Sequence, residues 1–241
     1  MSHTTNPAFD SASAQVNGSE NRPFADRHQA GVELAARLER YRGTDAVILA
    51  LPRGGIPVAF EIAEALGAPL DIFVVRKLGT PGHPELAMGA IASGGVRVLS
   101  DDVIRWYGIS QAAIETVARR ELIELERRER EYRRGRPLTD VRGRTVVLVD
   151  DGLATGATMR AAVDAVRACG PARVVVAVPV GSRTACAELA GISDETICAR
   201  TPEPFSAVGS WYIDFTQTTD DEVHALLEEH ARHVRARGPK P

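Results

Sequence analysis

Residues 145–158 read Thr-Val-Val-Leu-Val-Asp-Asp-Gly-Leu-Ala-Thr-Gly-Ala-Thr, and this stretch decides the fold. The apolar run 146–149 has no polar interruption, which is typical of a central parallel strand covered on both faces. Asp150 and Asp151 follow at the carboxyl end of that strand, where open α/β sheets bind their ligands. A loop of small residues then leads into a predicted helix over 159–169. This order predicts a ligand site at one edge of a parallel sheet.

The loop 154–158 is suited to a phosphate group. Its small residues, Ala154, Gly156 and Ala157, let backbone amides approach an anion. The N-terminus of the following helix adds about half a positive charge. Thr155 and Thr158 can add hydroxyl donors.

Four apolar residues, two acids and a Thr-Gly-x-Thr loop resemble the phosphoribosyl diphosphate (PRPP) signature of type I phosphoribosyltransferases. The resemblance implies a three-layer α/β fold with a central, mainly parallel sheet. It also implies transfer of 5-phosphoribosyl from PRPP to a nitrogenous acceptor, such as a nucleobase in salvage, with release of diphosphate. In that reaction Asp150 and Asp151 would be catalytic, binding the ribose hydroxyls and Mg²⁺, directly or through water.

The segment Pro52-Arg53-Gly54-Gly55 follows a predicted strand over 46–51 and matches the diphosphate loop of that family. Paired glycines allow backbone amides to approach the diphosphate, and Arg53 adds a fixed charge. The resemblance also implies a non-proline cis peptide in this loop. We therefore expect Arg53, Gly54 and Gly55 to bind PRPP.

Arg76 and Lys77 follow the next predicted strand, 70–75, and we expect them at the same sheet edge. With Mg²⁺ they would stabilise the leaving diphosphate as its negative charge develops. Segment 79–84 is rich in glycine and proline and predicts an irregular, mobile loop. Beyond it, 88–91 and 96–99 are expected to form a hairpin.

The acceptor is less well defined. Hypoxanthine–guanine enzymes place an aspartate where this chain has Ala154, and the local sequence looks more like adenine and uracil transferases. A hood over the acceptor is predicted in 201–216, where aromatic rings could stack on a planar base or, equally, attach the C-terminal helix to the core. Segment 22–43 is an alternative hood. The candidate acceptor-binding residues are Phe205, Trp211 and Tyr212.

The remaining pattern predicts one domain over 22–236 after a disordered leader, 1–21. A long helix over 110–134 carries interleaved Glu and Arg, which is typical of a solvated face or one side of an oligomer contact, such as a homodimer. Its expected apolar stripe runs through 114, 118, 122 and 125. The other expected helices cover 24–41, 56–66, 101–107, 183–189 and 220–234, and the other strands 173–178 and 195–199.

The net charge of −3 does not favour binding to nucleic acid or to an anionic membrane. With no apolar span or signal pattern, the sequence predicts a cytoplasmic protein. Cys169, Cys186 and Cys198 are expected to be unpaired small hydrophobes in a reducing compartment.

Two alternatives stay open for the function: a non-catalytic PRPP-binding regulator, and another α/β phosphate-binding protein such as a nucleotide hydrolase, although no Walker lysine motif is present.

Overall fold

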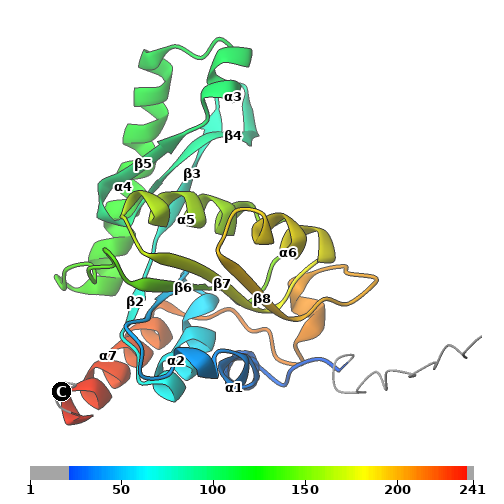
Figure 1. Ribbon diagram of the computed structural model, residues 1–241. Helices are drawn as coiled ribbons and strands as arrows, with labels where there is room; N and C mark the ends of the chain where they lie inside the picture. Colours follow the sequence, from blue (N-terminus) through cyan, green and yellow to red (C-terminus); the bar gives the residue numbers. More distant parts are fainter. Residues whose placement is uncertain (1–21, 238–241) are drawn as a thin grey trace, which may run out of the picture.

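The computed structural model describes residues 22–237, and its centre is a five-stranded parallel sheet (Figure 1). The strand order is β2-β1-β6-β7-β8, and each neighbouring pair is parallel. The strands are β1 (Val47–Ala50), β2 (Leu70–Ile72), β6 (Thr145–Val149), β7 (Arg173–Val180) and β8 (Glu195–Arg200). The predicted strand over 145–149 is therefore central, with β1 and β7 on its two sides.

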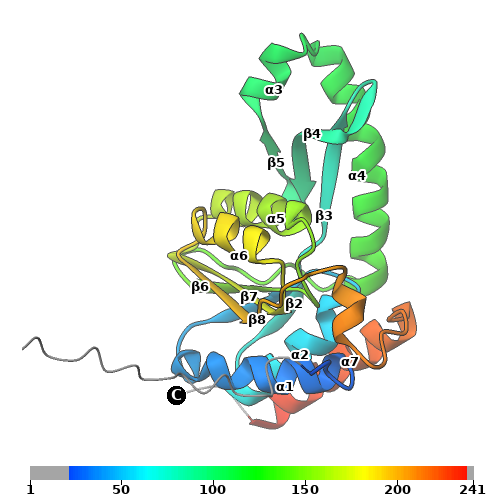
Figure 2. The same cartoon turned by 90° about the vertical axis from the view of Figure 1, so that its right-hand side faces the viewer.

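Helices cover both faces of this sheet and make three layers (Figures 1 and 2). Alternate residues of β6 point to opposite faces: Val147 and Val149 join one apolar cluster, and Val146 and Leu148 join the other. All four side chains are fully buried, which explains the uninterrupted apolar run. One face carries α1 (Arg27–Arg37), α2 (Gly55–Leu66) and α7 (Asp220–Arg237), and the other carries α5 (Ala157–Ala168) and α6 (Arg183–Ala190).

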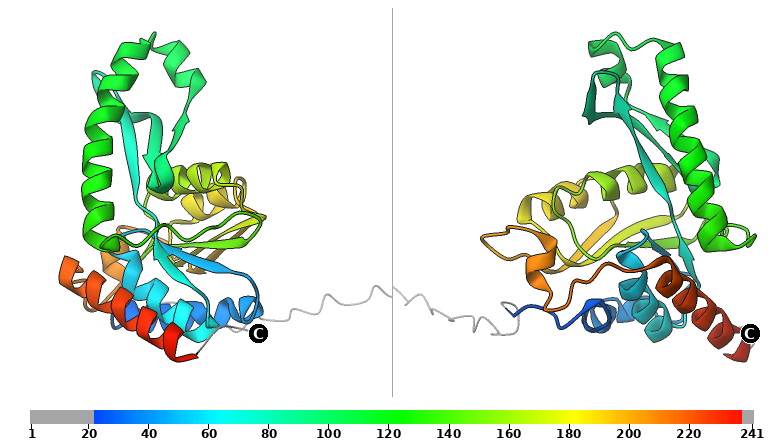
Figure 3. Two further views of the ribbon diagram at one scale, coloured as in Figure 1. Left: turned by 90° about the vertical axis from the view of Figure 1, so that its left-hand side faces the viewer. Right: turned by 180° about the vertical axis from the view of Figure 1, so that it is seen from behind.

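A second, antiparallel sheet projects from the first and forms an arm (Figures 2 and 3). We use "arm" for β3 (Val75–Thr80), β4 (His83–Ala92) and β5 (Val96–Leu99), with α3 (Asp101–Trp106) at its far end. The predicted hairpin of 88–91 with 96–99 is confirmed by the pairing of β4 with β5. Long helix α4 (Gln111–Arg133) runs back along the arm (Figure 3). Short 3₁₀ turns cover Glu39–Tyr41, Ser93–Gly95 and Val208–Trp211.

Three local predictions in this region were wrong. Segment 79–84 is a strand pair with a tight turn rather than a loop, because Gly82 takes a positive φ of 80° and Thr80 pairs with His83. The single strand expected over 70–75 is divided between the two sheets. Leu122, expected in the apolar stripe of α4, is 40% exposed, whereas Leu125 is buried.

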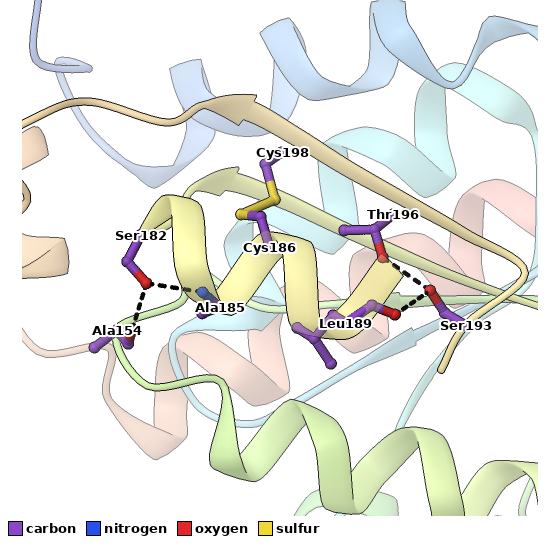
Figure 4. The surroundings of a disulfide bond; sticks show 8 residues. All are labelled: Ala154, Ser182, Ala185, Cys186, Leu189, Ser193, Thr196 and Cys198. Carbon is purple, nitrogen blue, oxygen red and sulfur yellow. Dashed lines mark hydrogen bonds between the residues drawn. A yellow bond between two sulfur atoms is a disulfide. The ribbon is translucent and has the colours of Figure 1, made fainter. Parts of the chain in front are cut away.

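The prediction that all three cysteines are unpaired was also wrong. Cys186 on α6 and Cys198 on β8 form a disulfide, and only Cys169 is free among the described residues (Figure 4). The two Cα atoms lie 6.6 Å apart because α6 packs against β8, a contact that the spacing of 12 residues does not reveal. Burial raises the pKa of the free Cys169 thiol.

The predicted leader, 1–21, lies outside the described residues. Between residues 22 and 237, no helix is both long enough and apolar enough to cross a membrane.

Candidate active site

Asp150 and Asp151 occupy the carboxyl end of β6 and hold a defined set of contacts. The Oδ1 atom of Asp150 accepts the backbone N–H of Asp151 at 2.9 Å. The Oδ2 atom of Asp151 accepts from Nε of Arg27 at 2.9 Å. The Tyr212 hydroxyl donates to the Asp151 carbonyl oxygen at 2.6 Å. The second acid is therefore held from both its side chain and its backbone.

Burial makes it costly for this pair to carry two negative charges. Desolvation raises the pKa of Asp150 well above its usual value, and the charge of Asp151 adds to the effect. Desolvation also raises the pKa of Asp151, against the opposing charge and hydrogen bond of Arg27. Burial likewise raises the pKa of the Tyr212 hydroxyl, which stays a donor. Hydroxyl donors or a divalent cation at the remaining carboxylate oxygens would relieve this cost.

The glycine loop between β1 and α2 lies directly against the two acids. A Cβ at Gly54 would lie 2.0 Å from Oδ2 of Asp151, and one at Gly55 would lie 2.7 Å from the backbone oxygen of Val149. Glycine is thus required here by contact with β6 and with the acid that follows it, a reason that sequence reasoning did not supply. The peptide bond between Pro52 and Arg53 is cis, as the family resemblance implies.

Arg53 points from this loop toward the start of α7. Its guanidinium lies 3.6 Å from Oδ1 of Asp220, and about a third of its side chain is exposed. Asp220 also accepts the hydroxyl hydrogen bond of Tyr132 on α4. Arg53 is accordingly a partly exposed cation beside the glycine loop.

The predicted phosphate loop is open to solvent. Gly156 takes a positive φ of 71° and precedes the first turn of α5. The side chains of Thr155 and Thr158 are both exposed, so their hydroxyls are accessible to a ligand. Ser182 donates to the carbonyl of Ala154 at 2.9 Å and so connects the loop to the start of α6 (Figure 4). Ser182 therefore holds the start of the loop, and the side chains of Thr155 and Thr158 are exposed to solvent.

The arm brings Lys77 to the phosphate loop. Two cavities of about 440 and 340 Å³ lie between the arm and α5, and Lys77 and Ala157 line both of them. Thr158 lines the larger cavity and Thr155 the smaller one. Lys77 also donates to the Glu85 carbonyl at 3.2 Å. Lys77 and the phosphate loop therefore line the same two cavities, whose linings include neither the paired acids nor the glycine loop.

Arg76 lines the larger of these two cavities but is bound to an acid of α4. Its Nε atom donates to Oε2 of Glu121 at 3.0 Å, and Nη2 donates to the same oxygen at 2.5 Å. Burial opposes ionisation of Glu121, yet the hydrogen bonds from Arg76 and Arg120 hold its pKa below the usual value. The prediction that Arg76 and Lys77 lie at the edge of the sheet that holds the acids was wrong, because both belong to β3 of the antiparallel sheet, where Arg76 joins the arm to α4.

The two segments predicted as alternative hoods, 22–43 and 201–216, pair with each other at Phe24. Phe24 donates its backbone N–H to Trp211 at 2.8 Å, and its carbonyl accepts from Ile213 at 2.8 Å. We use "hood" for residues 22–26 together with 201–216. Phe205 and Trp211 pack, partly buried, against the cluster that contains Val180.

Tyr212 is not available to stack on an acceptor, contrary to the sequence prediction. It is only 6% exposed, and its ring lies 5.5 Å from that of Phe24 and 5.0 Å, stacked, from that of Phe215. Its hydroxyl bond to Asp151 instead supports the paired acids. Packing against other aromatic rings of the hood buries Tyr212. The sequence alone cannot distinguish an aromatic residue with this role from one that stacks on a base.

Sequence reasoning missed Arg27 and Phe215. The Arg27 guanidinium lies 4.0 Å from the ring centre of Phe215 and donates to the carbonyl of Thr216 at 2.8 Å. Arg27 begins α1, where an arginine is an ordinary residue, and it is 124 residues from Asp151. No local signal identifies such a contact.

Comparison with known proteins decides the family. Residues 26–197 match the family model described as the phosphoribosyl transferase domain. The chain belongs to this family. Two Mycobacterium tuberculosis proteins, from strains CDC 1551 and H37Rv, are 53% identical to it over 215 residues, and their names assign them provisionally as phosphoribosyl transferases. The matches cover 89% of this chain and 48% of each relative, so the chain spans about half the length of those proteins.

A solved structure agrees with the fold of this phosphoribosyl transferase domain. The crystal structure of TT1426 from Thermus thermophilus is 46% identical, with a TM-score of 0.80. The match covers 86% of this chain and 98% of that one.

A further relative by sequence, named bifunctional protein PyrR, from Chloroflexus aurantiacus, is 33% identical over 129 residues. These residues cover 52% of this chain and 65% of PyrR.

Proposed function

We propose that this phosphoribosyl transferase domain transfers the 5-phosphoribosyl group from PRPP to a nitrogenous acceptor, with nucleobases as the first acceptors to test. The observation that carries the proposal is the contact between the glycine loop and the paired acids, where Gly54 leaves no room for a Cβ beside Asp151. A diphosphate on that loop and a ribose on those acids would be immediate neighbours. PRPP carries its diphosphate on the ribose, so its two binding sites have to be neighbours in this way.

Each part of the site has a role in this reaction. The loop 154–158 would hold the 5-phosphate through backbone amides and the hydroxyls of Thr155 and Thr158. The free carboxylate oxygens of Asp150 and Asp151 would accept hydrogen bonds from the ribose hydroxyls. Arg53 and the glycine loop would hold the diphosphate, and Lys77, which lines a cavity with Thr158 of the phosphate loop, would supply a second cation.

The reaction exchanges one bond at C1 of the ribose for another and leaves negative charge on diphosphate. The bond between C1 and the diphosphate oxygen breaks, and its electron pair leaves with diphosphate. A lone pair on the acceptor nitrogen forms the new bond to C1, and that nitrogen gives up its proton to water. Fixed positive groups near the diphosphate stabilise its developing charge, and one such donor is typically worth about 10²–10³ in rate.

Asp150 and Asp151 would suit an Mg²⁺ ion that the substrate also holds. The described residues contain no cluster of three or more His, Cys, Asp or Glu side chains able to hold a metal. Mg²⁺ is usually held by one or two carboxylates together with waters and substrate phosphates, a demand that Asp150 and Asp151 meet. When bound, Mg²⁺ would neutralise charge on the diphosphate. The ion would also offset the desolvation of the two acids.

A regulatory protein that binds PRPP without turnover is the second candidate. The likeness to a relative named as bifunctional favours keeping it, although that likeness covers about half of this chain. Arg53 beside the glycine loop and Lys77 beside the phosphate loop are fixed cations, which favour stabilisation of a leaving group over binding alone. We therefore rank the transferase first.

Calorimetric titration of PRPP, with and without Mg²⁺, tests the proposal. We expect Mg²⁺-dependent binding that the double variant Asp150→Asn, Asp151→Asn abolishes while its circular dichroism stays unchanged. Binding would then justify a screen of nucleobases for diphosphate release. Binding without release for every base would favour the regulator, and no PRPP binding by the wild type would refute both candidates.

A further inference from the structure

Arg27 connects the hood to the paired acids. Its Nε atom bonds Oδ2 of Asp151 at 2.9 Å, and Nη1 bonds the carbonyl of Thr216 at 2.8 Å. Its guanidinium also lies 4.0 Å from the ring centre of Phe215. The residue is 9% exposed, so water competes little for these contacts.

We propose that Arg27 is a positioning residue, which holds the Asp151 carboxylate in the orientation that binds the ribose hydroxyls. This inference rests on the proposed function, because it assigns Asp151 to the ribose. Arg27 itself needs no contact with the sugar. It acts through the carboxylate that it holds.

Two neighbours contact the same carboxylate oxygen of Asp151. Arg27 engages Oδ2 from one side, and Gly54 lies so close to the same oxygen that no Cβ fits between them. Oδ1 is therefore the oxygen left for a ligand. Without Arg27, the charged carboxylate would lose its cation and its fixed position, and the adjacent Asp150 would repel it.

The hood in turn fixes Arg27. Thr216 and Phe215 belong to the segment that ends the hood, and both contact the guanidinium. Tyr212, from the same segment, holds the backbone of Asp151 through its hydroxyl. The hood consequently supports the ribose-binding acid at two points, one on the side chain and one on the backbone.

Arg200 offers a matched control for the loss of a buried arginine. It is 6% exposed, pairs with Glu33 at 2.7 Å and lies 3.5 Å from the ring centre of Phe24 in the hood. It therefore makes the same kinds of contact as Arg27, but none of its hydrogen bonds reaches Asp151. A purely structural effect should appear equally in Arg27→Met and Arg200→Met.

The test uses two ligands that differ only in the ribose hydroxyls. 1,4-Anhydroribitol 5-phosphate has the ring, the phosphate and both hydroxyls, whereas tetrahydrofurfuryl phosphate has the same ring and phosphate without them. The ratio of their dissociation constants, measured by calorimetry on the full chain, reports the hydroxyl contacts alone. Wild-type protein should prefer the first ligand by about 10-fold or more, as expected for hydrogen bonds to charged groups.

We expect Arg27→Met to reduce this preference to less than about 3-fold, while its affinity for tetrahydrofurfuryl phosphate stays near that of the wild type. Arg27→Lys should recover part of the preference, because an ammonium restores the charge but not the fork of donors. Arg200→Met should keep the wild-type preference even where its thermal midpoint falls.

Two results would overturn the inference: a wild-type preference in folded Arg27→Met, or an equal loss of preference in Arg200→Met. A wild-type protein that binds both ligands equally would instead refute the ribose-binding role of the acids, and with it the proposed function. The two failures are thus distinguishable.

Discussion

The substitution Gly54→Ala tests whether the glycine loop and the ribose-binding acid form one site. An alanine Cβ at this position would lie 2.0 Å from Oδ2 of Asp151 and 2.6 Å from its Cγ. Non-bonded contacts of this kind stay beyond about 3 Å, so the carboxylate has to move by roughly 1 Å. The backbone at Gly54 is helical, with φ of −59° and ψ of −32°, and accepts alanine without strain.

The expected effect therefore falls on ligand binding more than on the backbone. Displacement of the Asp151 carboxylate removes a hydrogen bond between a charged group and a ribose hydroxyl, worth about 1.5–3 kcal/mol. That loss corresponds to roughly 10- to 150-fold weaker PRPP binding. The same movement lengthens the 2.9 Å contact with Arg27.

Calorimetric titration of PRPP in the presence of Mg²⁺ measures this change. Gly191→Ala is the control, since Gly191 lies at the end of α6 with φ of −78°, and a Cβ there would meet only the Glu188 carbonyl, at 3.3 Å. We expect the control to bind like the wild type. A dissociation constant for Gly54→Ala within about 2-fold of the wild type would refute the argument that the loop and Asp151 are packed into a single ligand site.

Three further outcomes are expected. Tyr212→Phe should lower the free energy of unfolding by about 1–3 kcal/mol in denaturant titrations, because the Asp151 carbonyl loses its 2.6 Å donor; an unchanged midpoint would contradict this role. The raised pKa of Asp150 means that the folded state binds its proton more tightly than the unfolded state, so this group's contribution to stability falls as pH rises from about 4 through the folded pKa. Asp150→Asn should therefore melt above the wild type at neutral pH and lose that advantage below about pH 4, whereas a constant difference across pH would exclude the mechanism. Cys198→Ser should lower the free energy of unfolding by about 2–4 kcal/mol under non-reducing conditions, because the variant lacks the loop that the bond to Cys186 closes. The stability of this variant should not change with dithiothreitol. A wild type whose stability is equally insensitive to dithiothreitol would show that the bond does not form in solution.

Much of the fold followed from local patterns. Strands buried on both faces read as unbroken apolar runs, so β1, β6 and β7 were predictable within one or two residues. Glycine after an apolar helix also marked the end of α2, where Gly67 takes a positive φ of 60°. The arm was harder to predict, because a tight turn at Gly82 converts a loop-like composition into paired strands.

The sequence by itself determined the parallel sheet, the paired acids and the small-residue loop, since each depends on residues that are neighbours along the chain. Only the tertiary structure decided the supports of that site. Arg27 meets Asp151 across 124 positions, Tyr212 reaches it across 61, and Cys186 pairs with Cys198 through the packing of a helix on a strand. Such contacts depend on the way separate elements pack, and no periodicity within one segment records them.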